Sequence, residues 1–295
     1  MAVSAAPIGV RRRERRRGRR PRITRRGVLL YGFLIVLSII FLIPFYVMVR
    51  NAFMTDMAIT SPNYQILPTS PQFGNIPELF SNPDVPILSG LRISVIMAVT
   101  QVICQMVFAS MAGYALARIP FRYSNVVFLL VLGTLMIPSA VTFIPLYLVV
   151  SSLGWVNTLQ GLIAPGLFSA FAAFMFRQFY LDFPAEVEEA GRVDGLGYFG
   201  IYRRIAIPNS LGMIMALGVL AFINSWNSFT WPLVVGQSTS MWAVQVDVSS
   251  FIASQTIILH EVFMGALVAI LPVVVIFLIL QRYIVEGVKL SGVKG

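Results

Sequence analysis

Residues 28–49 read VLLYGFLIVLSIIFLIPFYVMV, a run of 22 side chains that carries no charge. About 20 apolar residues in a helix, each rising roughly 1.5 Å, cross the roughly 30 Å hydrocarbon layer of a membrane. Long continuous apolar runs are typical of membrane helices, because the strands of a membrane barrel alternate at every second residue. Five further runs have this character, at residues 93–116, 126–150, 159–176, 211–235 and 263–280. The sequence predicts an all-α polytopic membrane protein with six transmembrane helices.

The overall composition agrees with a membrane protein. Only 12% of the 295 residues are charged, against roughly a quarter in an ordinary soluble domain. The net charge is +10, and 11 of the 22 basic residues lie between Arg11 and Arg26. That tail has no aromatic side chain on which nucleic-acid bases could stack, so we expect no nucleic-acid partner. We interpret the tail as a topology signal.

The distribution of basic residues predicts the orientation, because arginine and lysine hold loops on the cytoplasmic side. If the N-terminus is cytoplasmic, only Arg50 and Arg92 lie outside. With six spans, both termini are then cytoplasmic. A twin-arginine pair precedes the first apolar run as in an export signal, but the run is too long and no small-residue cleavage site follows it, so we expect an uncleaved span. The expected organisation is a basic cytoplasmic tail, 1–26, and a transmembrane domain, 27–295.

The longest segment expected on the cytoplasmic side, residues 178–208, is patterned as two short helices. Pro184 and three glutamates favour a helix start, and Gly195 favours its end. A second helix is expected over residues 198–206, with two arginines in its last turn and Pro208 ending it. The patterned loop is therefore the first place in which to look for function.

The string of residues in this loop is distinctive: residues 188–195 read EEAGRVDG and residues 205–208 read IAIP. It closely resembles the EAA loop of binding-protein-dependent ABC importer permeases, in which a helix docks on the ATPase. Residues 113–118 (GYALAR) and 226–233 (WNSFTWPL) resemble further segments of this family, and residues 173–179 (AFMFRQF) precede the EAA loop as in its carbohydrate group. The final residues, 292–295 (GVKG), resemble the tail of the maltose-type permease subunit.

This resemblance implies a complex in the bacterial inner membrane. The chain would form the pathway for a sugar or sugar-like solute with a second permease subunit, and glycerol phosphates remain an alternative cargo. Two ATPase subunits would bind ATP and Mg beneath the membrane lipid, and an extracytoplasmic solute-binding protein would deliver the solute from above.

The resemblance also assigns roles to individual residues. Coupling to the ATPase is implied for the loop residues Glu188, Glu189, Ala190, Gly191, Asp194, Gly195 and Pro208. Contact with the ATPase is implied for the tail residues Gly292, Val293, Lys294 and Gly295. Gly191 stands where the family usually has alanine, which is expected to loosen the docking helix by up to about 1 kcal/mol.

The sequence has few residues that could catalyse a reaction or bind a metal or nucleotide. Residues 195–200 match the dinucleotide pattern GxGxxG, but no strand is expected before them. The sequence has no P-loop, and one histidine, His260, with one cysteine, Cys104, does not make a metalloprotease zinc site or a nucleophile pair. We expect no catalytic residue, cofactor or metal in this chain, and ATP hydrolysis in a partner subunit.

A self-contained secondary transporter and a membrane scaffold are the alternatives. Ion-coupled and proton-coupled carriers mark their coupling sites with ionisable residues inside spans. The cores of the six expected spans contain none, which favours energy coupling from outside the membrane. Copurification of an ATPase distinguishes an importer subunit from both alternatives.

Polar residues in the fifth expected span suggest a solute pathway. Asn224, Asn227 and Trp231 have the spacing i, i+3 and i+7, so on one continuous helix they share a face. Amide and aromatic side chains suit sugar hydroxyls and sugar rings. Hydrogen bonds between helices explain the same amides equally well.

Overall fold

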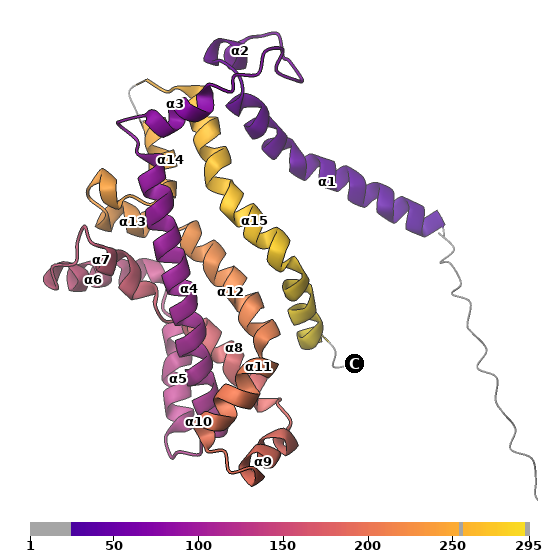
Figure 1. Cartoon of the computed structure of the whole chain (residues 1–295), viewed down its shortest axis with the longest axis vertical. Helices are drawn as coiled ribbons and strands as arrows, with labels where there is room; N and C mark the ends of the chain where they lie inside the picture. Colours follow the sequence, from indigo (N-terminus) through magenta and orange to yellow (C-terminus); the bar gives the residue numbers. More distant parts are fainter. Residues whose placement is uncertain (1–24, 254–255, 293–295) are drawn as a thin grey trace, which may run out of the picture. The chain divides into compact units, whose positions relative to one another are not determined.

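The computed structural model describes residues 25–253 and 256–292. Most of the basic tail 1–26 and the tail residues Val293, Lys294 and Gly295 therefore lie outside the described residues. All regular elements of the described residues are helices, which confirms the predicted all-α fold (Figure 1). The chain divides into two compact units, Met1–Val47 and Met48–Gly295.

The helices differ widely in length, and long ones alternate with short ones along the chain. The first helix is α1 (Arg25–Ala52), most of which belongs to the first unit. Residues 178–208, which resemble the EAA loop, are called the coupling loop. The helices up to this loop are α2 (Asp56–Thr60), α3 (Asn75–Ser81), α4 (Ile87–Arg118), α5 (Ser124–Leu135), α6 (Ser139–Ser152), α7 (Leu159–Ile163), η1 (Ala164–Gly166) and α8 (Ala170–Leu181). The remaining helices are α9 (Ala185–Val193), α10 (Tyr198–Ile201), η2 (Tyr202–Ala206), α11 (Ile207–Asn209), α12 (Leu211–Trp226), α13 (Thr230–Val235), η3 (Thr239–Met241), α14 (Val244–Ala253) and α15 (Leu259–Gly292).

The part of α1 in the first unit is apolar around its whole circumference. Its large side chains are exposed, as Leu29 (74%) and Phe41 (66%) illustrate. A helix that is hydrophobic on every side suits a lipid environment. The first unit therefore has the properties of a membrane span.

In the second unit, α4 is the central helix and packs against α8, α12 and α14, while α15 packs against α12 (Figure 1). The contact between α4 and α8 depends on Gly113, where a Cβ atom would lie 2.6 Å from the Cβ of Phe176. Small residues allow membrane helices to approach this closely. Gly113 belongs to the GYALAR segment, so that segment has a packing role.

The apolar runs supply helices that can span a membrane. Among the described residues, four helical stretches qualify as membrane spans, and two bent helix pairs, α5 with α6 and residues 198–209 with α12, bring the number to six when each pair counts as one span. The span predicted over residues 126–150 is not one unbroken helix, because it consists of α5 and α6, which meet at 100°. Pro138 causes the break, since it has no N–H group and disfavours helical geometry at Ile137.

The expected continuous helix over residues 211–235 is also wrong. Helix α12 ends at Trp226, and α13 starts only at Thr230. Pro232 would clash with the carbonyl group four residues before it in an unbroken helix, whereas proline is tolerated in a first turn. The break places Pro232 in the first turn of α13.

The start of α15 is fixed by a residue from another helix. The carboxylate of Asp56, in α2, accepts hydrogen bonds from the backbone N–H groups of Leu259 (3.2 Å) and His260 (2.9 Å). Burial alone would raise the pKa of Asp56, but the hydrogen bonds from His260 and Leu259 outweigh it, and the pKa lies below its usual value. The connection between α1 and α4 is thereby tied to α15.

Candidate coupling loop and solute groove

The first helix of the coupling loop forms as its sequence predicts. Pro184 precedes α9, acidic residues occupy its first turn, and Arg192 lies in its last turn. Gly195 has φ +79°, and its N–H donates to the carbonyl of Arg192 at 3.0 Å. The N–H of Leu196 donates to the carbonyl of Gly191 at 2.9 Å, which completes a Schellman cap. The helix end predicted at Gly195 is confirmed.

The second helix of the loop differs from the prediction. It continues from α10 through a π-helical turn, η2, into α11, where the N–H of Ile207 donates to the carbonyl of Tyr202. Pro208 therefore does not end the helix at residue 206. The wide π turn accommodates a proline, which cannot donate a hydrogen bond itself. The chain turns by 74° only after Asn209, where α12 follows.

Helix α9 has a buried face and an exposed face. Glu188 (5%) is buried against the rest of the unit, and so is Gly191. Glu189, Ala190 and Asp194 are exposed. Large apolar side chains on this polar loop are exposed as well, namely Val193 (88%) and Phe199 (66%). Exposed apolar side chains next to acidic ones are typical of a surface that binds another protein.

The buried face of α9 is joined to α4 by an ion pair. Arg118, the last residue of α4, places its Nε atom 3.2 Å from Oε1 of Glu188, without the alignment of a hydrogen bond. Arg118 also donates from Nη2 to the carbonyl of Phe183. No sequence motif predicts this pair, because its two residues lie far apart in the chain. The ion pair thereby links α9 to the end of α4.

Three tyrosines connect the coupling loop to the membrane helices. The ring of Tyr114 lies 5.4 Å from that of Tyr180 and 5.2 Å from that of Tyr202, between centroids. The hydroxyl of Tyr202 is 2.8 Å from that of Ser110, in α4. All three rings are buried. The cluster ties η2 and α8 to α4 independently of the ion pair.

A cavity of about 320 Å³ lies near the middle of the second unit, and we call it the polar groove. It is lined by Gln101, Gln105, Ser139, Thr142, Phe143, Leu146, Leu162, Pro165, Gly166, Ala221, Asn224, Ser225, Ser228 and Trp231. The indole N–H of Trp231 donates to the carbonyl of Gly161 at 3.1 Å, and its ring contacts that of Phe143 edge-on. Trp231 is therefore held in position at the groove.

The structure brings Asn224 and Trp231 to the polar groove but places Asn227 elsewhere. Asn227 lines a second cavity of about 330 Å³ together with Gln245, whose Nε2 lies 3.4 Å from Oδ1 of Asn227. The expected common helix face does not form, because Asn227 caps the end of α12 and Trp231 belongs to α13. Gln101 and Gln105, which the sequence pattern did not single out, line the groove instead.

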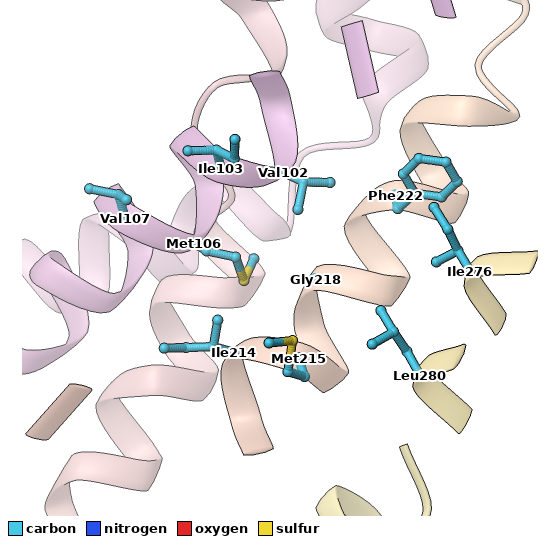
Figure 2. A pocket seen from close by; sticks show the side chains of 10 residues that line it. All are labelled: Val102, Ile103, Met106, Val107, Ile214, Met215, Gly218, Phe222, Ile276 and Leu280. Atoms are coloured by element: carbon cyan, nitrogen blue, oxygen red, sulfur yellow. The ribbon is translucent and has the colours of Figure 1, made fainter. Parts of the chain in front are cut away.

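A third cavity, of about 380 Å³, is apolar throughout (Figure 2). Figure 2 shows its side chains, which come from α4, α12 and α15. The lining residues are Val102, Ile103, Met106, Val107, Ile214, Met215, Gly218, Phe222, Ile276 and Leu280. None of these side chains can hydrogen-bond a hydroxyl-rich solute, and burying a polar group without a partner is costly. This apolar groove is therefore unsuited to a sugar.

Residues 105–290 match the sequence pattern of a known family, described as the binding-protein-dependent transport system inner membrane component. The chain belongs to this family. The match contains the whole coupling loop and all of α12 and α13. The chain is accordingly a permease subunit of an ABC importer and an integral protein of the inner membrane.

Sequence similarity to known permeases extends over most of the chain. It is 36% identical over 202 residues (68% of this chain, 72% of the relative) to the arabinooligosaccharides transport system permease protein AraQ of Halalkalibacterium halodurans. It is 31% identical to AraQ of Bacillus subtilis over 265 residues, covering 89% of this chain and 94% of that one. It is 30% identical to the sn-glycerol-3-phosphate transport system permease protein UgpE of Salmonella typhi over 271 residues, with 89% and 96% covered.

A solved structure supports the permease fold. A chain of a bacterial ABC transporter involved in the import of the acidic polysaccharide alginate superposes with a TM-score of 0.78. The superposition covers 90% of this permease and 99% of that chain, at 20% sequence identity. The two chains therefore share the same overall fold.

Proposed function

We propose that this permease forms one half of the pathway of an importer for a neutral sugar-like solute, and that α9 docks on an ATPase subunit. The proposed docking role rests on the fact that α9 has one exposed face and one buried face. Its exposed face offers Glu189 and Val193 to a partner, while its buried Glu188 is paired with Arg118 of α4. A helix built in this way can transmit a push from a partner to the membrane helices.

The path from the coupling loop to the solute follows α4. This helix has 32 residues and is about 48 Å long at 1.5 Å per residue. It contacts α9 through Arg118 at its end and lines the polar groove with Gln101 and Gln105 at its middle. Closure of two ATPase subunits on ATP and Mg would move α9, and α4 would carry the movement to the groove, switching access between the two sides.

The remaining partners complete the proposed importer. A second permease subunit would cover the open side of the polar groove, and an extracytoplasmic binding protein would deliver the solute. Both termini would be cytoplasmic, and the tail from Gly292 to Gly295 would reach the ATPase. A proton- or ion-coupled carrier is disfavoured, because the residues that line the polar groove carry no charge.

The chemistry of the polar groove favours a neutral sugar over a glycerol phosphate. Its polar side chains are amides and hydroxyls, with the rings of Phe143 and Trp231 beside them. A phosphate group would call for arginine or lysine, and the groove residues of this chain include neither. Relatives named for arabinooligosaccharides and for sn-glycerol-3-phosphate are both similar to this chain. The relatives therefore do not distinguish the two kinds of cargo, and the proposal rests on the side chains of the groove.

The solute pathway is tested by Asn224→Ala. Asn224 is exposed in the groove and makes no side-chain hydrogen bond to any described residue, so its loss leaves packing unchanged. A hydrogen bond to the solute contributes about 0.5–1.5 kcal/mol, and we expect uptake of a labelled neutral oligosaccharide to fall roughly 2- to 10-fold. The measurement uses proteoliposomes that contain the assembled importer and its binding protein.

The matched control is Asn227→Ala, an equal deletion outside the polar groove. We expect it to leave oligosaccharide uptake near the wild-type level. The pathway assignment fails if Asn227→Ala lowers uptake and Asn224→Ala does not. The cargo proposal fails if wild-type proteoliposomes take up sn-glycerol-3-phosphate and no neutral sugar, and uptake without ATP would point to a secondary transporter.

A further inference from the structure

The single histidine of the chain lies in a cluster of acidic side chains far from the coupling loop. His260 is in the first turn of α15, near the start of α4, whereas α9 contacts the end of α4. Side chains from three helices surround it: Asp56 of α2, Glu78 of α3 and Glu261 of α15. We call these four residues the histidine cluster. The proposed transport mechanism uses none of them.

The hydrogen bonds of His260 determine which ring nitrogen is free. Its Nδ1 lies 2.7 Å from Oδ1 of Asp56. An ionised carboxylate can only accept, so Nδ1 donates to Asp56 and Nε2 is the nitrogen left to face a ligand. The Nε2 atom is buried and has no hydrogen-bond partner among the described residues. A buried polar atom without a hydrogen-bond partner calls for an explanation, and a bound ion supplies one.

The atoms around Nε2 have the spacing of metal ligands. Nε2 is 3.4 Å from Oε2 of Glu78. Ligand atoms of Glu78, His260 and Glu261 all lie within 4.8 Å of one another. Zinc binds histidine nitrogen and carboxylate oxygen at about 2.0–2.2 Å, so two ligands of a tetrahedral site lie about 3.4 Å apart. The His260–Glu78 pair already has this distance, and a carboxylate oxygen of Glu261 lies within 4.8 Å of both ligand atoms.

Supporting hydrogen bonds hold the two inner ligands. Asp56 orients the ring of His260, as carboxylates do behind metal-bound histidines. Asn82 donates from Nδ2 to Oε2 of Glu261 at 3.0 Å. Glu261 is only 6% exposed, so its carboxylate is desolvated and would gain from a bound cation. Glu78, whose side chain is 53% exposed, would close the site from the solvent side.

We propose that Glu78, His260 and Glu261 form a binding site for a divalent transition metal ion of the zinc type, with Asp56 and Asn82 as supporting residues. One nitrogen and two carboxylate ligands suit zinc, and water would occupy the fourth position. The bound ion joins α3 to the start of α15 and so fastens the connection between α1 and α4. The sequence pattern did not indicate this site, because Glu78 and His260 meet only in the fold.

The test is a zinc titration of the full-length permease. The protein is purified in detergent without a histidine tag, stripped with a chelator, and titrated with Zn²⁺ in a calorimeter. We expect one ion per chain, with a Kd at or below about 1 µM, and a higher midpoint of thermal unfolding with zinc. Asp56→Asn, which weakens the support of His260 and the cap at the start of α15, is expected to weaken binding roughly 10- to 100-fold.

Two exposed acidic residues supply a matched pair of variants. Glu78→Gln removes a ligand that is half exposed and is expected to weaken zinc binding at least tenfold without unfolding the chain. Asp84→Asn removes an equal charge from an exposed position of the same connection and is expected to change nothing. Absence of zinc binding in the wild type, or equal affinity in Glu78→Gln, would overturn the site. Visible absorption of the Co²⁺-loaded chain, lost in His260→Gln, independently reports the histidine ligand.

Discussion

Replacing Gly195 by proline is expected to reduce ATP-driven uptake at least tenfold, while the chain still inserts into the membrane. Gly195 has φ +79°, and its N–H donates to the carbonyl of Arg192. Proline fixes φ near −65° and has no N–H, so the cap of α9 is lost. The forced change in φ strains the backbone at this position by about 1–3 kcal/mol, and the end of α9 loses one hydrogen bond. Uptake and ATPase activity in proteoliposomes measure the effect.

A matched control lies two residues further along the loop. Gly197 has φ −75°, and a Cβ atom there would meet no atom within 4 Å. Gly197→Ala is therefore expected to support uptake at the wild-type level.

Glu189→Lys reverses the charge of the exposed face without touching the fold, and it is expected to uncouple uptake from ATP hydrolysis as well. Normal uptake in both Gly195→Pro and Glu189→Lys would contradict the docking role of α9.

Breaking the buried ion pair is expected to have the second large effect. Arg118→Met leaves the carboxylate of Glu188, whose side chain is 6% exposed, without its partner. Removing one member of a buried pair costs about 3–5 kcal/mol, and we expect about 3 kcal/mol here because the Arg118 side chain is still 17% exposed. Thermal unfolding in detergent is expected to occur at a lower temperature, and uptake is expected to fall. The pair contributes both stability and transmission.

The double variant Arg118→Met with Glu188→Leu separates these two contributions. Replacing both charges by apolar groups removes the buried unpaired carboxylate, so stability is expected to recover. Uptake is expected to remain low, because α9 is no longer attached to α4 by charge. Arg122→Met serves as the control, since Arg122 is exposed. Stability unchanged by Arg118→Met, or uptake restored in the double variant, would contradict the role of the pair in coupling.

Local signals predicted the parts of the permease that depend on local physics. Apolar runs predicted the spans because a membrane demands about 20 consecutive apolar residues. The glutamates and Gly195 predicted α9 because a helix start favours acidic residues and a helix end favours a left-handed glycine. The resemblance of residues 188–195 to the EAA loop then predicted the family. In each case the information lies within a few consecutive residues.

Breaks within apolar runs and long-range contacts were not predictable in this way. The segments on both sides of Pro138 are apolar, so composition alone does not reveal that α5 and α6 meet at 100°. Helix α12 ends at Trp226, among polar residues that were expected to lie within one span, and this end moves Asn227 away from Asn224 and Trp231. The Arg118–Glu188 pair and the histidine cluster join residues from distant parts of the chain. Such contacts become visible only when the helices are packed.

Docking of α9 on the ATPase is tested most directly by cross-linking from its exposed face. With Cys104, the single cysteine, replaced by serine, Val193→Cys carries a photoreactive group at a position that is 88% exposed. In membranes containing the assembled importer, irradiation is expected to join this chain to the ATPase subunit. Asp84→Cys, exposed near the other end of α4, is expected to give no ATPase adduct. An ATPase adduct from Asp84→Cys and none from Val193→Cys would contradict the docking of α9.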